Sequence, residues 1–471
     1  MAGFELASPE DIRHRRLVIA TAVSANLLGN IGLIGVNVAA PAISRQMGMS
    51  AAEVGWLSLA TLLTMAMFSA PVARLSDLVG RRRVTIYGLW VAIIGSALGA
   101  LANSPLTLLI SRGLTGLGLV AFFTTVTTMA AAAYPPQMRG RALGLTISSV
   151  YIGLSVAPLL AGLLVESLGW PALFWFTVIG LTPPAILVLF IRQDPPPDPG
   201  QKLDYPGAGL WTLAIALLFS GLASLGFNAS LGAIGAGAIL MVWFVRRSLA
   251  SPSPILDITL FRDSRRFSFS SLAAFISYIS SFSVSFLLSL YLQYPRGLSP
   301  SEAGWLLICQ PVVQAILTPF AGRLSDRIDA GVMASLGLGL ILAALLVFAN
   351  NLTLETSRLA LVLNMGLFGA GFALFSAPNS NAIMGAVPPQ RLGQASGVIT
   401  VTRLSGQITS IAVTTMVFSL VIGPGELQPE LFPRLIQATQ VCFWAFTPLA
   451  LLGMVASLAR GAKNPVSLMT K

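Results

Sequence analysis

Long apolar stretches separated by short polar segments dominate this chain. Fourteen runs reach about the 20 residues needed to cross about 30 Å of hydrocarbon. They lie near 17–43, 54–73, 84–103, 106–134, 141–165, 170–192, 207–226, 229–248, 267–293, 303–322, 331–350, 357–380, 394–422 and 436–459. Hydrocarbon offers the backbone no hydrogen-bond partners, and the alternation of a β-barrel strand is absent, so each run is predicted to be a helix. The pattern therefore predicts an all-α polytopic membrane protein with 14 transmembrane helices.

One polar segment occurs twice with the same register. The stretch 50–77 recurs at 299–326, with an offset of 249 residues between Asp77 and Asp326. The matching pairs are Glu53 and Glu302, Gly55 and Gly304, Trp56 and Trp305, Leu57 and Leu306, Arg74 and Arg323, and Ser76 and Ser325. A second repeat pairs Pro135-Pro136-Gln137 with Pro388-Pro389-Gln390. Parallel repeats in a membrane chain are typical of transporters built from two similar bundles around a site between them.

The repeat divides the chain into two bundles of six helices with an additional pair between them. The predicted segments are a cytoplasmic N-terminal segment at 1–16, a bundle at 17–192, a linker at 193–206, two extra helices at 207–248, a linker at 249–266, a second bundle at 267–460 and a tail at 461–471. Proline and charge in both linkers suit exposed connections. A twelve-helix arrangement with a large amphipathic linker is the rival interpretation, and it requires that 207–248 does not cross the membrane.

Composition and charge support a membrane location and assign an orientation. Hydrophobic residues make up 55% of the chain and charged residues only 10%, which no water-soluble fold of this length could accommodate. When the runs are threaded alternately, most arginines, including Arg81 to Arg83, fall on one side, whereas Arg296, Arg358 and Arg434 fall on the other. By the positive-inside rule both termini are predicted to be cytoplasmic. The net charge of +11 then indicates attraction to anionic membrane lipid and not nucleic-acid binding.

The chain lacks the residues that several other functions need. Its single histidine, His14, lies in the polar N-terminal segment, so we expect no histidine-based metal site or triad in the membrane. Cys309 and Cys442 fall inside apolar runs, where packing is their simplest role. No lysine follows the glycine of a Walker A motif. We therefore predict neither an enzyme nor a cofactor-binding protein.

Three short patterns resemble motifs of the major facilitator superfamily. The segment Ala73 to Arg83 resembles its motif A, Arg112 to Gly118 resembles motif B, and Gly144, Gly153, Pro158 and Gly162 keep the spacing of the antiporter motif C. With the extra helix pair, the chain resembles the fourteen-helix drug:proton antiporters. The resemblance implies a monomer in the cell membrane that exports small amphipathic compounds by alternating access, in exchange for protons. Two alternatives stay open: an exporter of a specific metabolite or organic anion without proton coupling, and a non-transporting membrane sensor.

The resemblance also suggests which residues gate the transport cycle. Asp77 lies where the second run ends, with Gly80 and Arg81 directly after it. Its carboxylate could accept hydrogen bonds from Arg81 and from a neighbouring helix N-terminus, and so hold the bundles together on the cytoplasmic side. Asp326 and Arg327 would form a weaker counterpart in the second half. The alternative is that Asp77 only orients a loop.

The charged residues predicted to couple transport are few. Arg112 lies several residues inside an apolar run, where a guanidinium usually faces a partner or a wet cavity. Its likeness to the motif B arginine implies a role in proton coupling, and the alternative is snorkelling to the cytoplasmic interface. Glu166, near the outer end of the fifth run, is the nearest to a membrane carboxylate. Gly32 replaces the aspartate that the family usually carries in the first helix, which makes a neutral or anionic amphipath more plausible as substrate.

The remaining predictions concern packing and the substrate pathway. Gly144, Gly153 and Gly162 recur every nine residues, which we expect to keep small residues on about one helical face for close packing, with Pro158 as a bend. The resemblance implies a cavity lined by helices 1, 4, 7 and 10 of the two six-helix bundles, with helix 8 offering two further amides. The predicted pathway residues are Asn26, Asn30, Asn37, Tyr278, Phe282, Phe286, Gln293, Gln310, Gln314 and Asn364. The alternative for each is interhelical hydrogen bonding.

Overall fold

The computed structural model describes residues 9–134, 139–192, 203–224, 230–251, 254–256, 258–324, 328–387, 392–423 and 427–461. Within these ranges every regular element is a helix. The helices are α1 (Pro9–Met47), α2 (Ala51–Val79), α3 (Arg81–Ala100), α4 (Pro105–Ala133), α5 (Arg139–Leu168), α6 (Pro171–Leu187), η2 (Val188–Phe190), α7 (Tyr205–Ala223), α8 (Ser230–Ala250), α9 (Thr259–Asp263), α10 (Arg265–Ser281), α11 (Val284–Gln293), α12 (Pro300–Leu307), α13 (Cys309–Leu324), α14 (Ala330–Asn351), α15 (Arg358–Met384), α16 (Leu392–Val421), η4 (Pro429–Leu431) and α17 (Phe432–Ala459).

These helices form 14 candidate membrane spans, because α10 with α11 and α12 with α13 each make one span. The predicted number of spans is confirmed. Both α7 and α8 are long and apolar enough to cross a membrane, so the twelve-helix rival is wrong.

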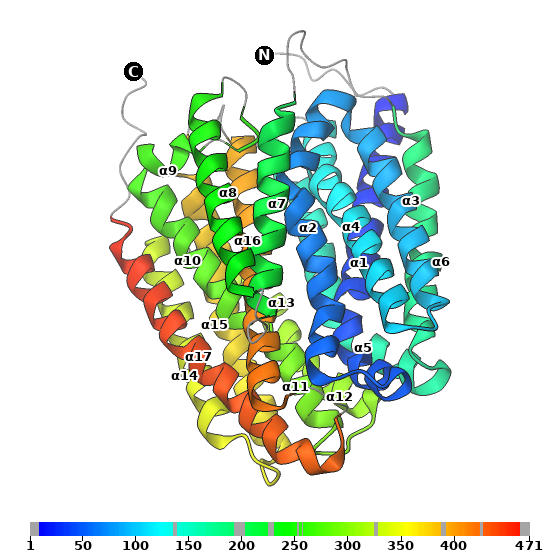
Figure 1. The fold of residues 1–471 in the computed structure, drawn as a ribbon. Helices are drawn as coiled ribbons and strands as arrows, with labels where there is room; N and C mark the ends of the chain where they lie inside the picture. Colours follow the sequence, from blue (N-terminus) through cyan, green and yellow to red (C-terminus); the bar gives the residue numbers. More distant parts are fainter. Residues whose placement is uncertain are drawn as a thin grey trace.

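The spans gather into two bundles that lie side by side, α1–α6 and α10–α17, with α7 and α8 in front of the seam in the view of Figure 1. An even number of spans places the start of α1 and the end of α17 at the same end of the molecule. We call this end, which also carries Arg81 to Arg83 at the start of α3, the basic side, and the opposite end the far side.

The internal repeat has the same local structure in both halves. Ser50 and Ser299 each cap the next helix, and the backbone N–H groups of Glu53 and Glu302 each donate to the capping hydroxyl at 3.3 Å. In return, the two glutamates accept hydrogen bonds from the serine N–H groups at 2.8 and 3.0 Å. This reciprocal capping satisfies N–H groups that a helix start leaves without partners. The repeat therefore marks the far-side start of the second span in each bundle.

The extra pair covers the seam between the bundles, since α7 packs against both α2 and α16. The Trp211 indole N–H donates to the Ala66 carbonyl at 3.1 Å, and the Thr212 hydroxyl donates to the Met67 carbonyl at 3.1 Å. At the basic side, Arg247 of α8 forms an ion pair with Asp204 at 2.7 Å. Side-chain bonds to α2 thus hold the added helices beside the first bundle.

Candidate functional site

A cavity of about 560 Å³ lies between the two bundles. Small-molecule sites typically enclose about 300–1,000 Å³, so the cavity has the size of one organic compound. Its walls come from α1 to α5 of the first bundle, from α10, α11, α13, α15 and α16 of the second, and from Ile255 and Leu256 before α9. The lining mixes amides and hydroxyls with aromatic and aliphatic side chains, which suits an amphipathic ligand.

The cavity reaches the basic side, where Asp77 and Arg81 belong to its wall. Their side chains are 48% and 36% exposed, and their ion pair spans 3.5 Å between the Arg81 Nη2 and Asp77 Oδ1 atoms. An exposed pair of this kind contributes at most about 1 kcal/mol. The motif A residues thus stand at the mouth of the cavity in this conformation. The proposed contact of Asp77 with the second bundle is not among its hydrogen bonds to described residues, and this role stays a prediction.

Hydrogen bonds between the bundles close the far side. The Gln293 amide donates to the Val38 carbonyl at 3.0 Å, and the Tyr294 hydroxyl donates to the Pro41 carbonyl at 3.2 Å. Arg45, which the sequence analysis did not single out, donates to the Gln293 carbonyl at 3.2 Å and lies 4.9 Å from the centre of the Tyr294 ring. These contacts join the end of α1 to the end of α11.

Two glycines of the internal repeat let helices of opposite bundles approach closely at this end. A Cβ atom on Gly55 of α2 would collide with the Thr415 side chain of α16, and one on Gly304 of α12 would collide with the Pro158 carbonyl of α5. The two contacts are equivalent by the repeat, because Gly55 and Gly304 are matching positions. At the far side, the repeated sequence element of each bundle therefore makes a close glycine contact with the other bundle.

Seven of the ten predicted pathway residues line the cavity. They are Asn26, Asn30, Asn37, Tyr278, Phe282, Gln310 and Gln314. The asparagines come from one face of α1, as their spacing of four and seven residues indicates. The Asn30 amide donates to the Asn26 carbonyl at 2.7 Å, and Asn37 accepts from the Ser58 hydroxyl at 2.6 Å.

The other three predicted pathway residues lie outside this cavity. Phe286 is fully buried and its ring lies 6.2 Å from that of Phe418. The cavity is lined at this point by Tyr278, Ser281, Phe282 and Ser285, whereas Phe286 packs toward α16. Gln293 belongs to the far-side closure, and the Asn364 amide donates to the Ala344 carbonyl at 3.0 Å. For these two residues, interhelical hydrogen bonding is the observed role.

Arg112 is buried away from the cavity and is 1% exposed. Its Nε atom donates to the Leu57 carbonyl of α2 at 3.0 Å, while the Thr61 hydroxyl donates to the Arg112 carbonyl at 3.1 Å. Its Nη2 atom has no hydrogen-bond partner among the described residues. Snorkelling to the cytoplasmic interface is wrong as an alternative, because Arg112 lies in the far-side half of α4 and its side chain is bonded to α2.

The motif C glycines do not share one helical face. A Cβ atom on Gly153 would lie 2.7 Å from the Leu27 carbonyl of α1, whereas one on Gly162 would collide with the Pro300 carbonyl at the start of α12. At 3.6 residues per turn, a spacing of nine residues is about two and a half turns, so successive glycines point in opposite directions. The one-face prediction was wrong, and α5 instead packs closely on two neighbours, one in each bundle. Gly144 also lies in α5.

Glu166 and Gly32, the position at which the resemblance led us to look for an acidic residue, both lie outside the cavity wall. The Glu166 carboxylate, at the far-side end of α5, accepts hydrogen bonds from the backbone N–H of Ser301 at 3.1 Å and from the Ser301 hydroxyl. Gly32 faces α6, where a Cβ atom would collide with the Thr177 side chain. An acidic side chain at this position would therefore need α6 to move. Asp326 and Arg327 lie outside the described residues.

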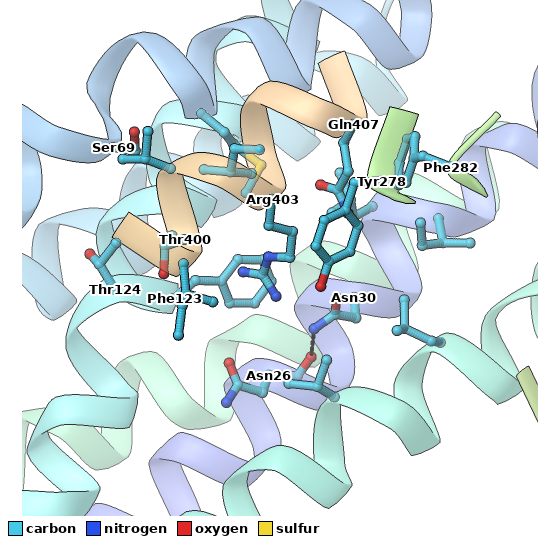
Figure 2. A pocket seen from close by; sticks show the side chains of 18 of the residues that line it. Asn26, Asn30, Ser69, Phe123, Thr124, Tyr278, Phe282, Thr400, Arg403 and Gln407 are labelled. Carbon is cyan, nitrogen blue, oxygen red and sulfur yellow. Dashed lines mark hydrogen bonds between the residues drawn. The ribbon is translucent and has the colours of Figure 1, made fainter. Parts of the chain in front are cut away.

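Arg403, and not Arg112, is the arginine that faces the cavity from within an apolar run. Arg403 of α16 belongs to the cavity wall, and Figure 2 shows it pointing from α16 toward α1 and α4, where Asn30 and Phe123 lie. Thr400 and Gln407 of the same helix also face the cavity. The sequence signal was present, since Thr400, Arg403 and Gln407 recur at spacings of three and four residues along one apolar run.

Comparisons with known proteins agree with this architecture. The family model described as Major Facilitator Superfamily matches residues 19–260 and 270–468. The chain belongs to the major facilitator superfamily. It is therefore a multi-pass membrane transporter and not an enzyme, as predicted.

Relatives of this superfamily member carry both broad and specific names. The multidrug resistance protein Stp of Mycobacterium tuberculosis is 32% identical over 88% of this chain and 77% of its own length. The riboflavin transporter RibZ of Clostridioides difficile is 25% identical over 90% of this chain and 92% of its own length. Among solved structures, a D-xylose-proton symporter aligns over 95% of this chain and 98% of that chain, with a TM-score of 0.69 at 13% identity. The resemblance to multidrug-efflux members of the superfamily is thus confirmed.

Proposed function

We propose that this transporter exports small amphipathic compounds from the cell by alternating access, in antiport with protons. The concentration of arginines at the basic side supports a cytoplasmic location for that side and for both termini in the cell membrane. In this orientation the cavity faces the cytoplasm, and the far-side closure separates it from the exterior. The relatives named for multidrug and lincomycin resistance support efflux as the direction.

The cavity between two repeat-related bundles is the observation on which the proposal rests. A compound enters it from the basic side past Asp77 and Arg81. The far side opens when the hydrogen bonds of Gln293, Tyr294 and Glu166 break and the bundles rock about the compound. Close packing of Gly55 on the Thr415 side chain and of Gly304 on the Pro158 carbonyl re-forms this closure after release.

Two carboxylates are placed to respond to protons at opposite ends of the path. Asp77 stands at the mouth beside Arg81, and Glu166 holds the start of α12 at the far side. Protonation of either carboxylate removes the charge that strengthens its hydrogen bonds, so each end of the path is released by a proton. Arg112 acts through α2, because its guanidinium is bonded to Leu57 and does not face the compound.

An exporter of a specific metabolite or organic anion is the second candidate. Asp77 is the only acidic residue among the described residues that line the cavity, while Arg403 stands deep inside it. RibZ, named for a single compound, shows that relatives of this chain include transporters described for one substrate.

Purified protein in proteoliposomes with a trapped pH dye tests the proposal. A panel of cationic, neutral and anionic amphipaths is added in turn under a fixed pH gradient. We expect at least one compound to trigger proton movement that is lost in Asp77→Asn and Arg112→Ala and kept in Arg434→Gln, a control at an exposed arginine of the far side. Flux of a labelled compound without proton movement would leave export standing and refute antiport. Absence of flux for the whole panel would refute the proposed function.

A further inference from the structure

The cavity contains one cation with no protein partner among the described residues. Arg403 lies eleven residues after the start of α16, about 16 Å along the helix axis. It is half-buried, and no described residue forms a hydrogen bond or an ion pair with its guanidinium. Arg81, the other basic residue of the wall, is already paired with Asp77 at the exposed mouth. The deep part of the cavity therefore carries a net positive charge.

Two residues of the same wall carry hydrogen-bond donors that have no partner among the described residues. The Asn26 Nδ2 atom has no hydrogen-bond partner among the described residues, although the side chain is only 2% exposed. The Ser281 hydroxyl, 5% exposed and also in the wall, is unpartnered in the same way. Buried donors normally find acceptors in a folded protein. The wall therefore offers a guanidinium, an amide and a hydroxyl that lack acceptors among the described residues.

Aromatic side chains line the space around these donors. Phe123 of α4 and Phe282 at the end of α10 belong to the wall, and the Tyr278 and Phe372 rings pack edge to face with their centres 5.7 Å apart. Figure 2 shows Arg403 between the side of the cavity that carries Phe123 and the side that carries Tyr278. These surfaces fit the apolar body of a ligand whose polar head meets the arginine.

We propose that the cavity binds an anionic aromatic amphipath, with its carboxylate, sulfonate or phosphate group held by Arg403 and assisted by Asn26. This assignment rests on the proposed function and names its substrate class. A guanidinium forms paired hydrogen bonds with such anions, and both partners exchange water for a charged partner in a confined space. A cationic amphipath meets repulsion from Arg403, and the described wall offers no deep carboxylate to offset it.

Two labelled compounds with the same ring and opposite permanent charge test the assignment: naphthalene-2-sulfonate and trimethyl(2-naphthyl)ammonium. Their flux is measured in proteoliposomes that contain the full chain. We expect the wild type to transport the sulfonate at least about tenfold faster than the ammonium compound. Arg403→Gln should lower sulfonate transport at least about tenfold, as expected for one lost charge-assisted contact. Arg403→Lys should retain part of it, and Arg434→Gln should match the wild type.

Asn26→Asp provides a second test that leaves Arg403 in place. A carboxylate in the same cavity wall as Arg403 should lower sulfonate transport and raise transport of the ammonium compound. The assignment is overturned if Arg403→Gln transports the sulfonate as well as the wild type does, or if the wild type prefers the ammonium compound. If neither compound moves while another member of the amphipath panel does, export stands and the anionic assignment fails. If no compound of either set moves, the proposed function itself fails.

Discussion

At the scale of single residues, Arg112 and Arg403 have different surroundings and hence different expected roles. Arg112 is enclosed and bonded to the α2 backbone, whereas Arg403 faces the cavity. A residue that touches the compound should affect its affinity. A residue that positions a helix should affect the rate at which the bundles rock.

We therefore expect Arg112→Met to lower the maximal transport rate while leaving the KM for the transported compound within about twofold of the wild-type value. The substitution keeps much of the apolar stem but removes the guanidinium hydrogen bond to the Leu57 carbonyl, which should lower the free energy of unfolding by about 1–3 kcal/mol. Initial rates over a range of compound concentrations separate the two parameters. A large rise in KM with an unchanged maximal rate would contradict the positioning role.

Asp77→Asn should change stability little and transport strongly. The Asp77–Arg81 pair is exposed, so its loss should lower the free energy of unfolding by less than about 1 kcal/mol. If Asp77 holds the bundles together in the other conformation, transport should fall at least about tenfold. Thermal unfolding in detergent and flux in proteoliposomes give the two readouts. Equal, small effects on both would show that Asp77 only orients the loop to α3.

At the scale of elements, the second span of each bundle forms the far-side closure through its repeated glycine. Gly55 packs on α16 and Gly304 packs on α5, so the same sequence element contacts the opposite bundle from both halves. The break at Ile308, between α12 and α13, separates this packed segment from the part of the span that supplies Gln310 and Gln314 to the cavity.

Gly304→Val should prevent full closure of the far side and reduce transport by at least about tenfold, because the added side chain would collide with the α5 backbone. Gly322→Val in the same span is the matched control, since a Cβ atom there meets no atom within 4 Å. Labelling of a single cysteine placed on the far-side half of the cavity wall measures the opening. Labelling of the Gly304 variant at the rate of the control would count against this closure.

At the scale of the whole molecule, the source of energy depends on the charge of the compound. An anion that leaves a cell with a negative interior is driven by the membrane potential, at about 2.3 kcal/mol per charge for 100 mV. Proton antiport would add the free energy of the proton gradient as a second driving force. The two contributions can be imposed separately on proteoliposomes.

With equal pH on both sides, we impose a potential of 100 mV, positive inside. Naphthalene-2-sulfonate should then accumulate inside about 50-fold at equilibrium if no proton is exchanged. If one proton is exchanged per molecule, two charges move and the accumulation ratio should be squared. With no potential, one pH unit should change the accumulation about tenfold if one proton is exchanged per molecule. An accumulation ratio that does not depend on the pH gradient would exclude proton antiport. An accumulation ratio that does not depend on the potential would exclude net charge transfer.

Much of the fold was predictable because hydrocarbon leaves the backbone few choices. Apolar runs long enough to span must be helices, and the described residues form the predicted 14 spans. The asparagines of α1 were also predictable as a group, since a continuous helix keeps residues four and seven apart on one face. All three line the cavity.

The site was less predictable wherever a side chain has a distant packing partner or a direction had to be assigned. Phe286 lies outside the cavity because its ring packs on Phe418 of α16, which spacing within its own run does not indicate. Gly153 and Gly162 face different neighbours because nine residues are not a whole number of turns. Gln293 bonds to Val38, and Arg45 contacts Gln293 and the ring of Tyr294, so each contact joins residues about 250 positions apart. Spacing within one run does not indicate such contacts.

The sequence by itself determined the solvent, the number of spans, the two-bundle repeat and the family, because these follow from apolar length and from residues that recur in register. Only the tertiary structure decided which of Arg112 and Arg403 faces the cavity and where the cavity is closed. Arg112 and Arg403 look alike within their apolar runs, and the surroundings of each depend on the rotation of α4 and α16 against helices distant in sequence. That rotation is fixed by side-chain packing across the bundles, which no single run of the sequence contains.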